Sequence, residues 1–217
     1  MAIILLIRHG ENNWVGKRLA GRTPGVHLNE NGRKQAEAIS NLLDRLPFNA
    51  IYSSPLERAV ETAQPLADKI SLTINVEEDL QEIDFGSWQG KTMKQLHRLK
   101  LWKTVQTEPE AMTFPGGESF RSAQIRLASC LMEINKKHSD HDLVACFSHS
   151  DSIRLLVAHF LNMPLNVFQR ISIDTTSITS IIIASEHIHV PYINLIPSEH
   201  FAQQMVSFFE KRDSKKK

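Results

Sequence analysis

The chain begins with an aliphatic run that ends abruptly in two basic residues. Five of the six residues at positions 2–7 are large aliphatics, and Arg8 and His9 follow directly. A short, continuous apolar run is typical of a strand that is covered on both faces and lies centrally in a sheet. The sequence therefore predicts a buried strand that delivers two basic side chains at its carboxyl end.

Short apolar segments and helical patterns alternate along the rest of the chain. Further strands are predicted at residues 50–52, 72–76 and 143–147, with a strand pair at residues 177–184 and 188–196 joined by residues 185–187. Helices are predicted after Asn29, from Ser54, around residues 120–134 and over residues 153–161. Strands that alternate with helices imply a three-layer α/β/α fold with a mostly parallel sheet and helices on both faces.

The helix predicted from Ser54 begins with clear signals. Ser54 and Glu57 match a capping box, and Pro55 occupies the expected first helical position. Arg58 then falls in the first turn, where an exposed cation faces the positive end of the helix dipole at a cost of about 0.3–1 kcal/mol. Because a bound anion reverses the sign of that interaction, Arg58 indicates an anion site.

Length and composition fit one α/β domain. The 217 residues and 41% hydrophobic content can build a sizeable core, and no linker or repeat divides the chain, so we predict a single domain over residues 1–217. Residues 91–117 are amphipathic and then loop-like, which predicts a lid or insertion. The charged segment EKRDSKKK, residues 210–217, predicts a disordered basic tail.

Charge and cysteine content argue against several classes of function. The 25 basic and 24 acidic residues nearly cancel, which disfavours nucleic acid or an anionic membrane as a partner. No apolar stretch approaches the roughly 20 residues that span a bilayer. Cys130 and Cys146 lack CxxC spacing and lie in apolar sequence, which indicates reduced thiols and a cytoplasmic protein. His187 and His189 have no third ligand at fitting spacing, so no metal or other cofactor is expected.

Basic residues follow three of the predicted strands. Arg8 and His9 end the first strand, Arg58 follows the second, and His149 follows the strand at residues 143–147, with Arg154 one turn further on. Ligands of parallel α/β sheets gather beyond the carboxyl ends of the strands. We therefore expect these side chains at one edge of the sheet, where helix N-termini can add backbone N–H groups.

Two arginines and two histidines suit a phosphoryl group. Arginine binds phosphate oxygens in a planar, bidentate way, and a histidine with one unprotonated ring nitrogen is a nucleophile. Fixed cations also stabilise the charge that phosphoryl transfer spreads over three oxygens. The departing oxygen needs a proton, and the segment EEDLQEIDF offers Glu82 and Asp84, between which the pattern does not choose.

Five ordered motifs resemble those of the histidine phosphatase superfamily, which includes cofactor-dependent phosphoglycerate mutases. The motifs are LLIRHGE at residues 5–11, SSPLERAVETA at 53–63, EIDFGSWQG at 82–90, PGGES at 115–119 and FSHSDSIR at 147–154. The resemblance covers residues 1 to about 160 and implies a phosphoglycerate mutase-like fold. It also implies that His9 is the phosphorylated nucleophile, that Arg8, Arg58 and His149 form the phosphate pocket, and that Glu82 is the proton donor.

The sequence departs from the family pattern at three positions. Many relatives have Thr or Ser in place of Asn12, Asn in place of Val15 and Gly in place of Ser150. Asn12 and Ser150 stay candidate phosphate contacts, with a hydroxyl donor added at Ser150. Three basic residues of the loop at residues 16–28 are candidate contacts to a second anionic group of the substrate: Lys17, Arg18 and, with the strongest case, Arg22.

The leading hypothesis is a metal-independent phosphomonoesterase that hydrolyses a small phosphorylated metabolite through phosphohistidine. The nearest alternative is a phosphoglycerate mutase, but such enzymes usually carry a longer, more arginine-rich insertion than this chain, whose segment 91–115 contains only Arg98. An alternative of another class is a non-catalytic phospholigand-binding or scaffold protein. The oligomeric state is open, with a homodimer among the alternatives, and Trp88 and Trp102 are predicted either to line the pocket or to pack beneath a lid.

Overall fold

The computed structural model describes residues 2–183 and 187–213, and within them it contains a six-stranded sheet. The spatial order is β3 (Ile74–Val76), β2 (Phe48–Ser53), β4 (Leu143–Ser148), β1 (Ala2–Arg8), β5 (Ile178–Ile183) and β6 (Ile188–Leu195). The first four strands are mutually parallel, whereas β5 runs antiparallel to β1 and β6 antiparallel to β5. The predicted, mostly parallel sheet is confirmed, with β1 in its interior.

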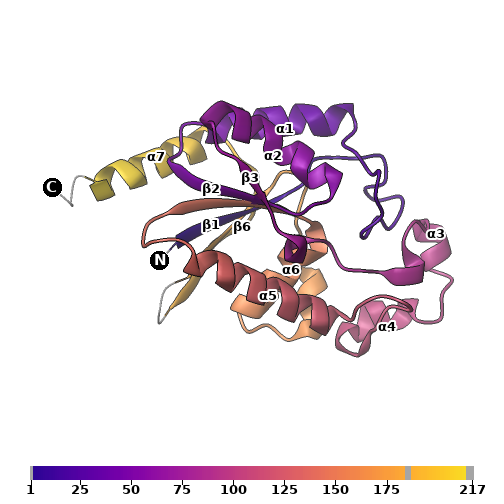
Figure 1. The fold of residues 1–217 in the computed structure, drawn as a ribbon. Coiled ribbons are helices and arrows are strands. Elements are labelled where there is room, and N and C mark those ends of the chain that lie inside the picture. Colours follow the sequence, from indigo (N-terminus) through magenta and orange to yellow (C-terminus); the bar gives the residue numbers. More distant parts are fainter. Residues whose placement is uncertain (1, 184–186, 214–217) are drawn as a thin grey trace.

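Helices cover both faces of the sheet, as predicted (Figure 1). One layer contains α1 (Glu30–Leu43), α2 (Glu57–Ile70) and α7 (Glu199–Asp213). The other contains α5 (Phe120–Lys136) and α6 (Ser150–Phe160), with α3 (Met93–Leu96) and α4 (Trp102–Thr107) beside them. Short 3₁₀ turns occupy the connections at Glu78–Leu80, Gly86–Trp88, Pro109–Ala111 and Leu165–Arg170.

The aliphatic run of β1 supplies side chains to two cores. Ile4 and Leu6 pack into the core beneath α5 and α6, while Ile3, Leu5 and Ile7 pack into the core beneath α1 and α2. All five are at most 4% exposed. Successive strand residues point to opposite faces, so a strand between two helical layers needs apolar residues throughout. Double-sided packing thereby fixes the backbone that carries Arg8 and His9.

Two local predictions were wrong. The helix α2 begins at Glu57 with Leu56 as its N-cap and no side-chain cap, so Ser54 and Pro55 lie before the helix. Ser54 is instead fully buried and bonded to a histidine of the site described below. The tail predicted to be disordered from residue 210 is helical through Asp213, because α7 packs Phe201 and Phe209 into the core; residues 214–217 lie outside the described residues.

The segment at residues 91–117 is packed against the rest of the molecule. Leu96, Val105, Met112 and Phe114 are each at most 5% exposed and belong to the core that α5 and α6 cover. The segment therefore contributes a wall to the fold, whether or not it also moves as the predicted lid. The strand pair at the end of the chain is confirmed, although residues 184–186 of its connection lie outside the described residues.

Replacing Leu5 with alanine tests the role of the first strand. Leu5 is fully buried, so Leu5→Ala is expected to lower the free energy of unfolding by about 2–5 kcal/mol through lost burial and a residual cavity. Ile125→Ala is the matched control, because Ile125 is 58% exposed and its loss should change stability by no more than about 0.5 kcal/mol. Urea denaturation measures both; equal losses would contradict the assignment of β1 as the centre of the core.

Candidate active site

The register of the sheet brings the predicted strand ends together. Arg8 on β1 pairs with Ser148 on β4, and Ser53 on β2 pairs with the neighbouring Phe147. A cavity of about 130 Å³ lies at this edge, and we call it the His9 cavity. Seven predicted site residues line it: Arg8, His9, Asn12, Arg18, Arg58, Glu82 and Ser150.

His9 presents one free ring nitrogen. Its Nδ1 lies 2.7 Å from the carbonyl oxygen of Gly10. A carbonyl oxygen only accepts hydrogen bonds, so Nδ1 carries the proton and Nε2 of the neutral ring keeps its lone pair. Burial, followed by the charges of Arg58 and Arg8, holds the pKa of His9 well below its usual 6.5. The ring is therefore neutral and nucleophilic at neutral pH.

Arg8 and Arg58 are cations with spare donors. Arg8 Nη1 donates to the Ile173 carbonyl at 2.7 Å, and Arg58 Nη2 donates to the Gly21 carbonyl at 2.6 Å. Nε of Arg8, and Nε and Nη1 of Arg58, are buried without a partner among the described residues. Burial is the main cause that lowers the pKa of Arg58 to about 10, which leaves it charged at neutral pH. Such unsatisfied donors beside a cavity indicate an anion site.

His149 lies fully buried next to His9, with ring centroids 5.3 Å apart. Its Nε2 is 2.8 Å from Ser54 Oγ, while its Nδ1 is buried without a partner in the described chain. Burial first, and then the charge of Arg58, holds its pKa well below 6.5. Ser54 therefore supports His149, whereas the sequence predicted it to cap a helix. Its position in the SSPLERAVETA motif is the signal that could have identified this role.

Glu82 is a buried carboxyl group held at the start of α6. Its Oε1 accepts from the Ser152 backbone N–H at 3.1 Å and from Ser152 Oγ at 2.9 Å, and its Oε2 accepts from the Asp151 N–H at 3.3 Å. Burial, and then the charge of Asp151, raises the pKa of Glu82. The N-terminus of α6 therefore binds this side chain, whereas the sequence had suggested it for the substrate anion.

Arg22 does not line the His9 cavity. Its Nε donates to the backbone carbonyl of Glu82 at 2.9 Å, and its Nη2 donates to Glu118 at 2.9 Å. Glu118 also accepts from Arg126 Nη2 at 2.8 Å and from the Asp84 backbone N–H at 2.9 Å. Arg22, which the sequence predicted to contact the substrate, therefore belongs to a hydrogen-bonded network next to Glu82. This network fixes the loop that carries Glu82.

Glycines allow close backbone contact between the loop at residues 82–90 and the PGGES motif at residues 115–119. A Cβ atom on Gly86 would lie 2.3 Å from the Pro115 carbonyl oxygen, and one on Gly117 would lie 2.2 Å from the Asp84 carbonyl oxygen. Neither contact is sterically allowed, so both positions require glycine. Asp84 itself caps this turn by accepting from the Gly86 N–H at 2.9 Å, which separates its role from that of Glu82.

The other candidates near the cavity are largely occupied by local contacts. Asn12 Oδ1 accepts from the backbone N–H groups of Trp14 and Val15, at 2.9 and 3.1 Å, which shapes the loop after β1. Arg18 Nη1 donates to the Gly90 carbonyl at 2.9 Å, and Lys17 is exposed. Ser150 Oγ lies 3.5 Å from the Ile173 carbonyl, a weak contact that leaves the hydroxyl able to turn to a ligand.

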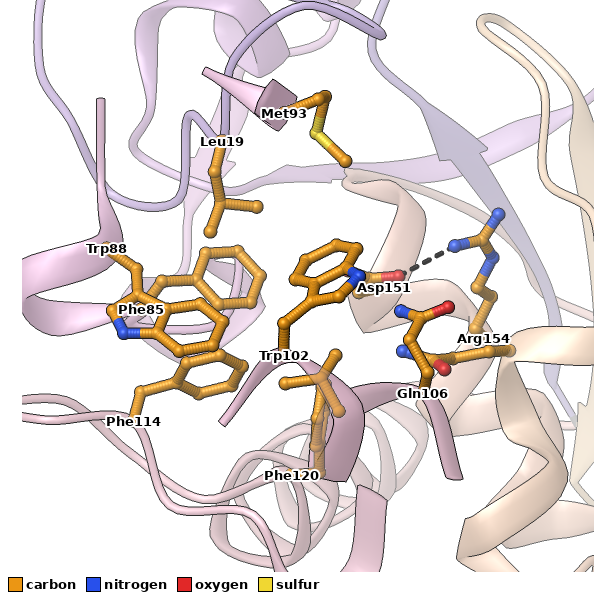
Figure 2. A pocket seen from close by; sticks show the side chains of 12 residues that line it. Leu19, Phe85, Trp88, Met93, Trp102, Gln106, Phe114, Phe120, Asp151 and Arg154 are labelled. Carbon is orange, nitrogen blue, oxygen red and sulfur yellow. Dashed lines mark hydrogen bonds and ion pairs between the residues drawn. The ribbon is translucent and has the colours of Figure 1, made fainter. Parts of the chain in front are cut away.

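A second, larger cavity adjoins the first. This aromatic cavity has a volume of about 280 Å³ and shares Leu19, Phe85 and Asp151 with the His9 cavity. Trp88 and Trp102 both line this aromatic cavity and do not line the His9 cavity (Figure 2). Arg154 also lies here, paired with Asp151 at 2.8 Å, and it does not line the His9 cavity; His149, which follows β4, does not line it either.

Two further findings concern the described residues as a set. No group of three or more His, Cys, Asp or Glu side chains among them is arranged to hold a metal ion, and His187 and His189 are both exposed. None of the helices that the structure describes is long and apolar enough to cross a membrane.

A neutral nucleophilic histidine, two buried cations with free donors and a carboxyl group of raised pKa define a phosphoryl-transfer site of the phosphohistidine type. The family model of the histidine phosphatase superfamily (branch 1) matches residues 4–196. The chain therefore belongs to the histidine phosphatase superfamily and is an enzyme of the histidine phosphatase type.

Individual relatives agree with this family. Phosphoserine phosphatase 1 of Hydrogenobacter thermophilus is 31% identical over 185 residues, which cover 82% of this chain and 84% of that protein. The structure of Bacillus stearothermophilus YhfR superposes with a TM-score of 0.85 at 27% identity, covering 91% of this chain and 98% of that one. Entamoeba histolytica phosphoserine phosphatase, solved with 3-phosphoglyceric acid, superposes with a TM-score of 0.81 at 30% identity, covering 92% and 99%.

The network behind Glu82 can be tested with Arg22→Ala. Losing the bond to the Glu82 carbonyl should misplace the carboxyl group, so kcat should fall by up to about 10²-fold with a smaller change in KM, and the pH profile of kcat should shift. Arg121→Ala is the matched control, because Arg121 is an exposed arginine paired with Glu110 on the surface. An unchanged kcat and pH profile in Arg22→Ala would contradict the positioning role.

Proposed function

We propose that the chain is a metal-independent phosphomonoesterase that works through a phosphohistidine at His9. The observation that carries the proposal is the set of three buried, unpartnered donors on Arg8 and Arg58 beside the free Nε2 of His9, with the unpartnered ring nitrogen of His149 nearby. Donors of this kind are costly to bury unless a ligand uses them. A phosphoryl group, with three charged oxygens, matches both their number and their charge.

In the first step, His9 Nε2 attacks phosphorus and the bond from phosphorus to the alcohol oxygen breaks. Arg8 and Arg58 hold the equatorial oxygens, and Nδ1 of His9 stays bonded to Gly10 throughout. Glu82 donates its proton to the departing oxygen, for which its raised pKa suits it. The products of this step are the free alcohol, phosphohistidine and the Glu82 carboxylate.

In the second step, water attacks the phosphohistidine. The Glu82 carboxylate takes a proton from the water as its oxygen bonds to phosphorus, and the bond between phosphorus and Nε2 breaks. Inorganic phosphate leaves, and His9 and the protonated Glu82 return to their starting states. Arg8 and Arg58 supply the positive charge that the transition state requires, so the cycle needs no metal ion.

Hydrolysis is favoured over mutase activity by the surroundings of the His9 cavity. A mutase must hold a phosphoglycerate and its carboxylate in two orientations while water is excluded. The single arginine of segment 91–115, Arg98, is exposed and lines neither cavity described above. Binding without catalysis, as in a scaffold protein, requires neither the oriented Nε2 of His9 nor the buried carboxyl of Glu82, and the chain has both.

A cytoplasmic location is part of the proposal, supported by the two cysteines. Cys130 and Cys146 are both free and buried. Burial raises the pKa of Cys130 to about 12 and that of Cys146 well above its usual value, which makes both thiols unreactive. Free, protected thiols suit a reducing compartment. A homodimer also stays a proposal, for which the exposed Ile188 and Ile193 of the edge strand β6 offer a surface.

His9→Ala tests the nucleophile directly. The variant should lose at least about 10³-fold in kcat and form no acid-labile phosphoenzyme, whereas the wild type should show one after rapid quenching at high pH. His189→Ala, which removes an exposed histidine on β6, should retain full activity. If His9→Ala hydrolyses an aryl phosphate as fast as the wild type, the mechanism is wrong.

Glu82→Gln tests the proton donor. The wild-type kcat/KM should fall as pH rises through the raised pKa of Glu82, because only the protonated carboxyl acts as the acid; the fall at low pH should lie well below 6.5, where His9 is protonated. Glu82→Gln should lose the alkaline fall and about 10²–10⁴-fold in kcat on alkyl phosphates.

The leaving group provides the control for that variant. The first step with 4-nitrophenyl phosphate releases a stable phenolate that needs no proton, so Glu82→Gln should keep its burst of nitrophenol. A burst lost as severely as activity on alkyl phosphates would assign Glu82 a role other than proton donation.

A further inference from the structure

The aromatic cavity lies where the alcohol half of a substrate must go. In the proposed function, on which this inference rests, the departing oxygen contacts Glu82 because it takes the proton from that carboxyl. Phe85 stands three residues further along the same loop and lines both cavities, as do Leu19 and Asp151. A chain of atoms leaving the His9 cavity on the Glu82 side therefore passes Phe85 and enters the aromatic cavity.

The walls of the aromatic cavity are apolar and fixed in place. Phe85, Trp88 and Phe114 are each at most 4% exposed, and Phe114 meets the other two rings edge-on, with centroids 4.8 and 5.3 Å apart. Trp102 lies nearly parallel to Trp88, with centroids 6.4 Å apart and an interplanar angle of 29°. Leu19, Met93 and Trp102 are only partly buried, so their apolar surfaces stay available to a ligand (Figure 2).

The charged groups of this cavity oppose a second anion on the substrate. Arg154 is its one lining arginine or lysine among the described residues, and Asp151 neutralises it through a 2.8 Å bond. Asp151 also lines the junction with the His9 cavity, so a carboxylate that enters the aromatic cavity next to the ester would face the Asp151 carboxylate; Arg18 lines the His9 cavity but not the aromatic one. Figure 2 shows this pair, with Gln106, across the cavity from Phe85, Trp88 and Phe114.

We propose that the aromatic cavity binds the alcohol half of the substrate and selects phosphate monoesters of neutral alcohols that carry an aromatic ring. The ring of the alcohol packs against the partly exposed side chains of Leu19, Met93 and Trp102, and a polar edge of the ligand meets Gln106. Monoesters of small acids, such as phosphoserine and 3-phosphoglycerate, leave the apolar walls uncovered, and 3-phosphoglycerate also places an unbalanced carboxylate near Asp151. They are the poorer substrates of this chain.

The test compares alkyl phosphates of similar intrinsic reactivity, so that leaving-group chemistry does not decide the result. Wild-type kcat/KM is measured for 3-phenylpropyl phosphate, glycerol 3-phosphate, phosphoserine and 3-phosphoglycerate. The phenylpropyl ester should exceed each of the others by about 10- to 100-fold, the gain expected from burying one aromatic ring. Equal or higher values for phosphoserine or 3-phosphoglycerate overturn the inference and leave the phosphatase activity standing, whereas hydrolysis of none of the four, nor of 4-nitrophenyl phosphate, overturns the proposed function.

Two variants connect the preference to the cavity. Trp102→Ala should lower the ratio of kcat/KM for 3-phenylpropyl phosphate to that for glycerol 3-phosphate at least tenfold, while Phe208→Ala, an exposed aromatic on α7, should leave this ratio unchanged. Met93→Lys, at a partly buried position of the cavity, should lower the same ratio and raise kcat/KM for 3-phosphoglycerate by supplying a cation. Unchanged ratios in both folded variants place the alcohol elsewhere and overturn the inference.

Discussion

Burial of Arg8 and Arg58 close to one another is the constraint on which the rest of the site depends. Burial is the main cause that lowers the pKa of both guanidinium groups, and the charge of Arg8 lowers the pKa of Arg58 further. Removing such charges from water costs several kcal/mol per ion unless partners compensate. Each arginine donates to one backbone carbonyl, and the Glu82 carboxylate, when it is ionised, is the largest influence raising the pKa of each. The cluster keeps an excess of positive charge, which a phosphoryl dianion balances.

The same surroundings explain the state of the histidines. Burial is the first cause that holds the pKa of His9 and His149 well below 6.5, and the charges of Arg58 and Arg8 lower it further. Neutrality is what a nucleophilic imidazole needs, so the groups that bind the phosphate also activate His9. The fold must stabilise these buried charges, so the strand that carries Arg8 and His9 must be rigid. The two cores that pack against β1 provide that rigidity.

The sequence was sufficient to locate the polar residues at the strand ends, but it did not predict the hydrogen-bond partners of Ser54 and Arg22. The strands predicted at residues 2–7, 50–52 and 143–147, with the polar residues after them, were sufficient to place Arg8, His9, Arg58 and His149 at one edge, because period-two burial and parallel topology are local and general rules. The partners of Ser54 and Arg22 were not accessible in this way. A serine before a helix can cap it or bond a distant histidine, and only the packing of β2 against β4 puts Ser54 beside His149.

The choice between Glu82 and Asp84 shows the same limit of residue patterns. Composition of the acidic loop left Glu82 and Asp84 equivalent, and the family resemblance, rather than the pattern, separated them. The structure gives a physical reason: Asp84 closes a turn onto Gly86, whereas Glu82 reaches the start of α6. Long-range contacts of this kind depend on register between segments that lie far apart in the chain, which residue patterns do not encode locally.

The two cavities are formed by parts of the chain that differ in how freely their residues can be substituted. The phosphate half is built from strand ends whose positions the sheet determines, so a substitution there disturbs buried charge. The alcohol half is built largely from residues 91–117 and the loop before them, with side chains such as Met93 and Trp102 that face a cavity and carry no catalytic charge. Phe85 joins the halves because it follows the acid on one loop, so any movement of Glu82 also moves the wall that meets the alcohol. Specificity and proton donation in this chain are therefore mechanically coupled through the loop at residues 82–90, which Glu118, Arg22 and Arg126 hold in place.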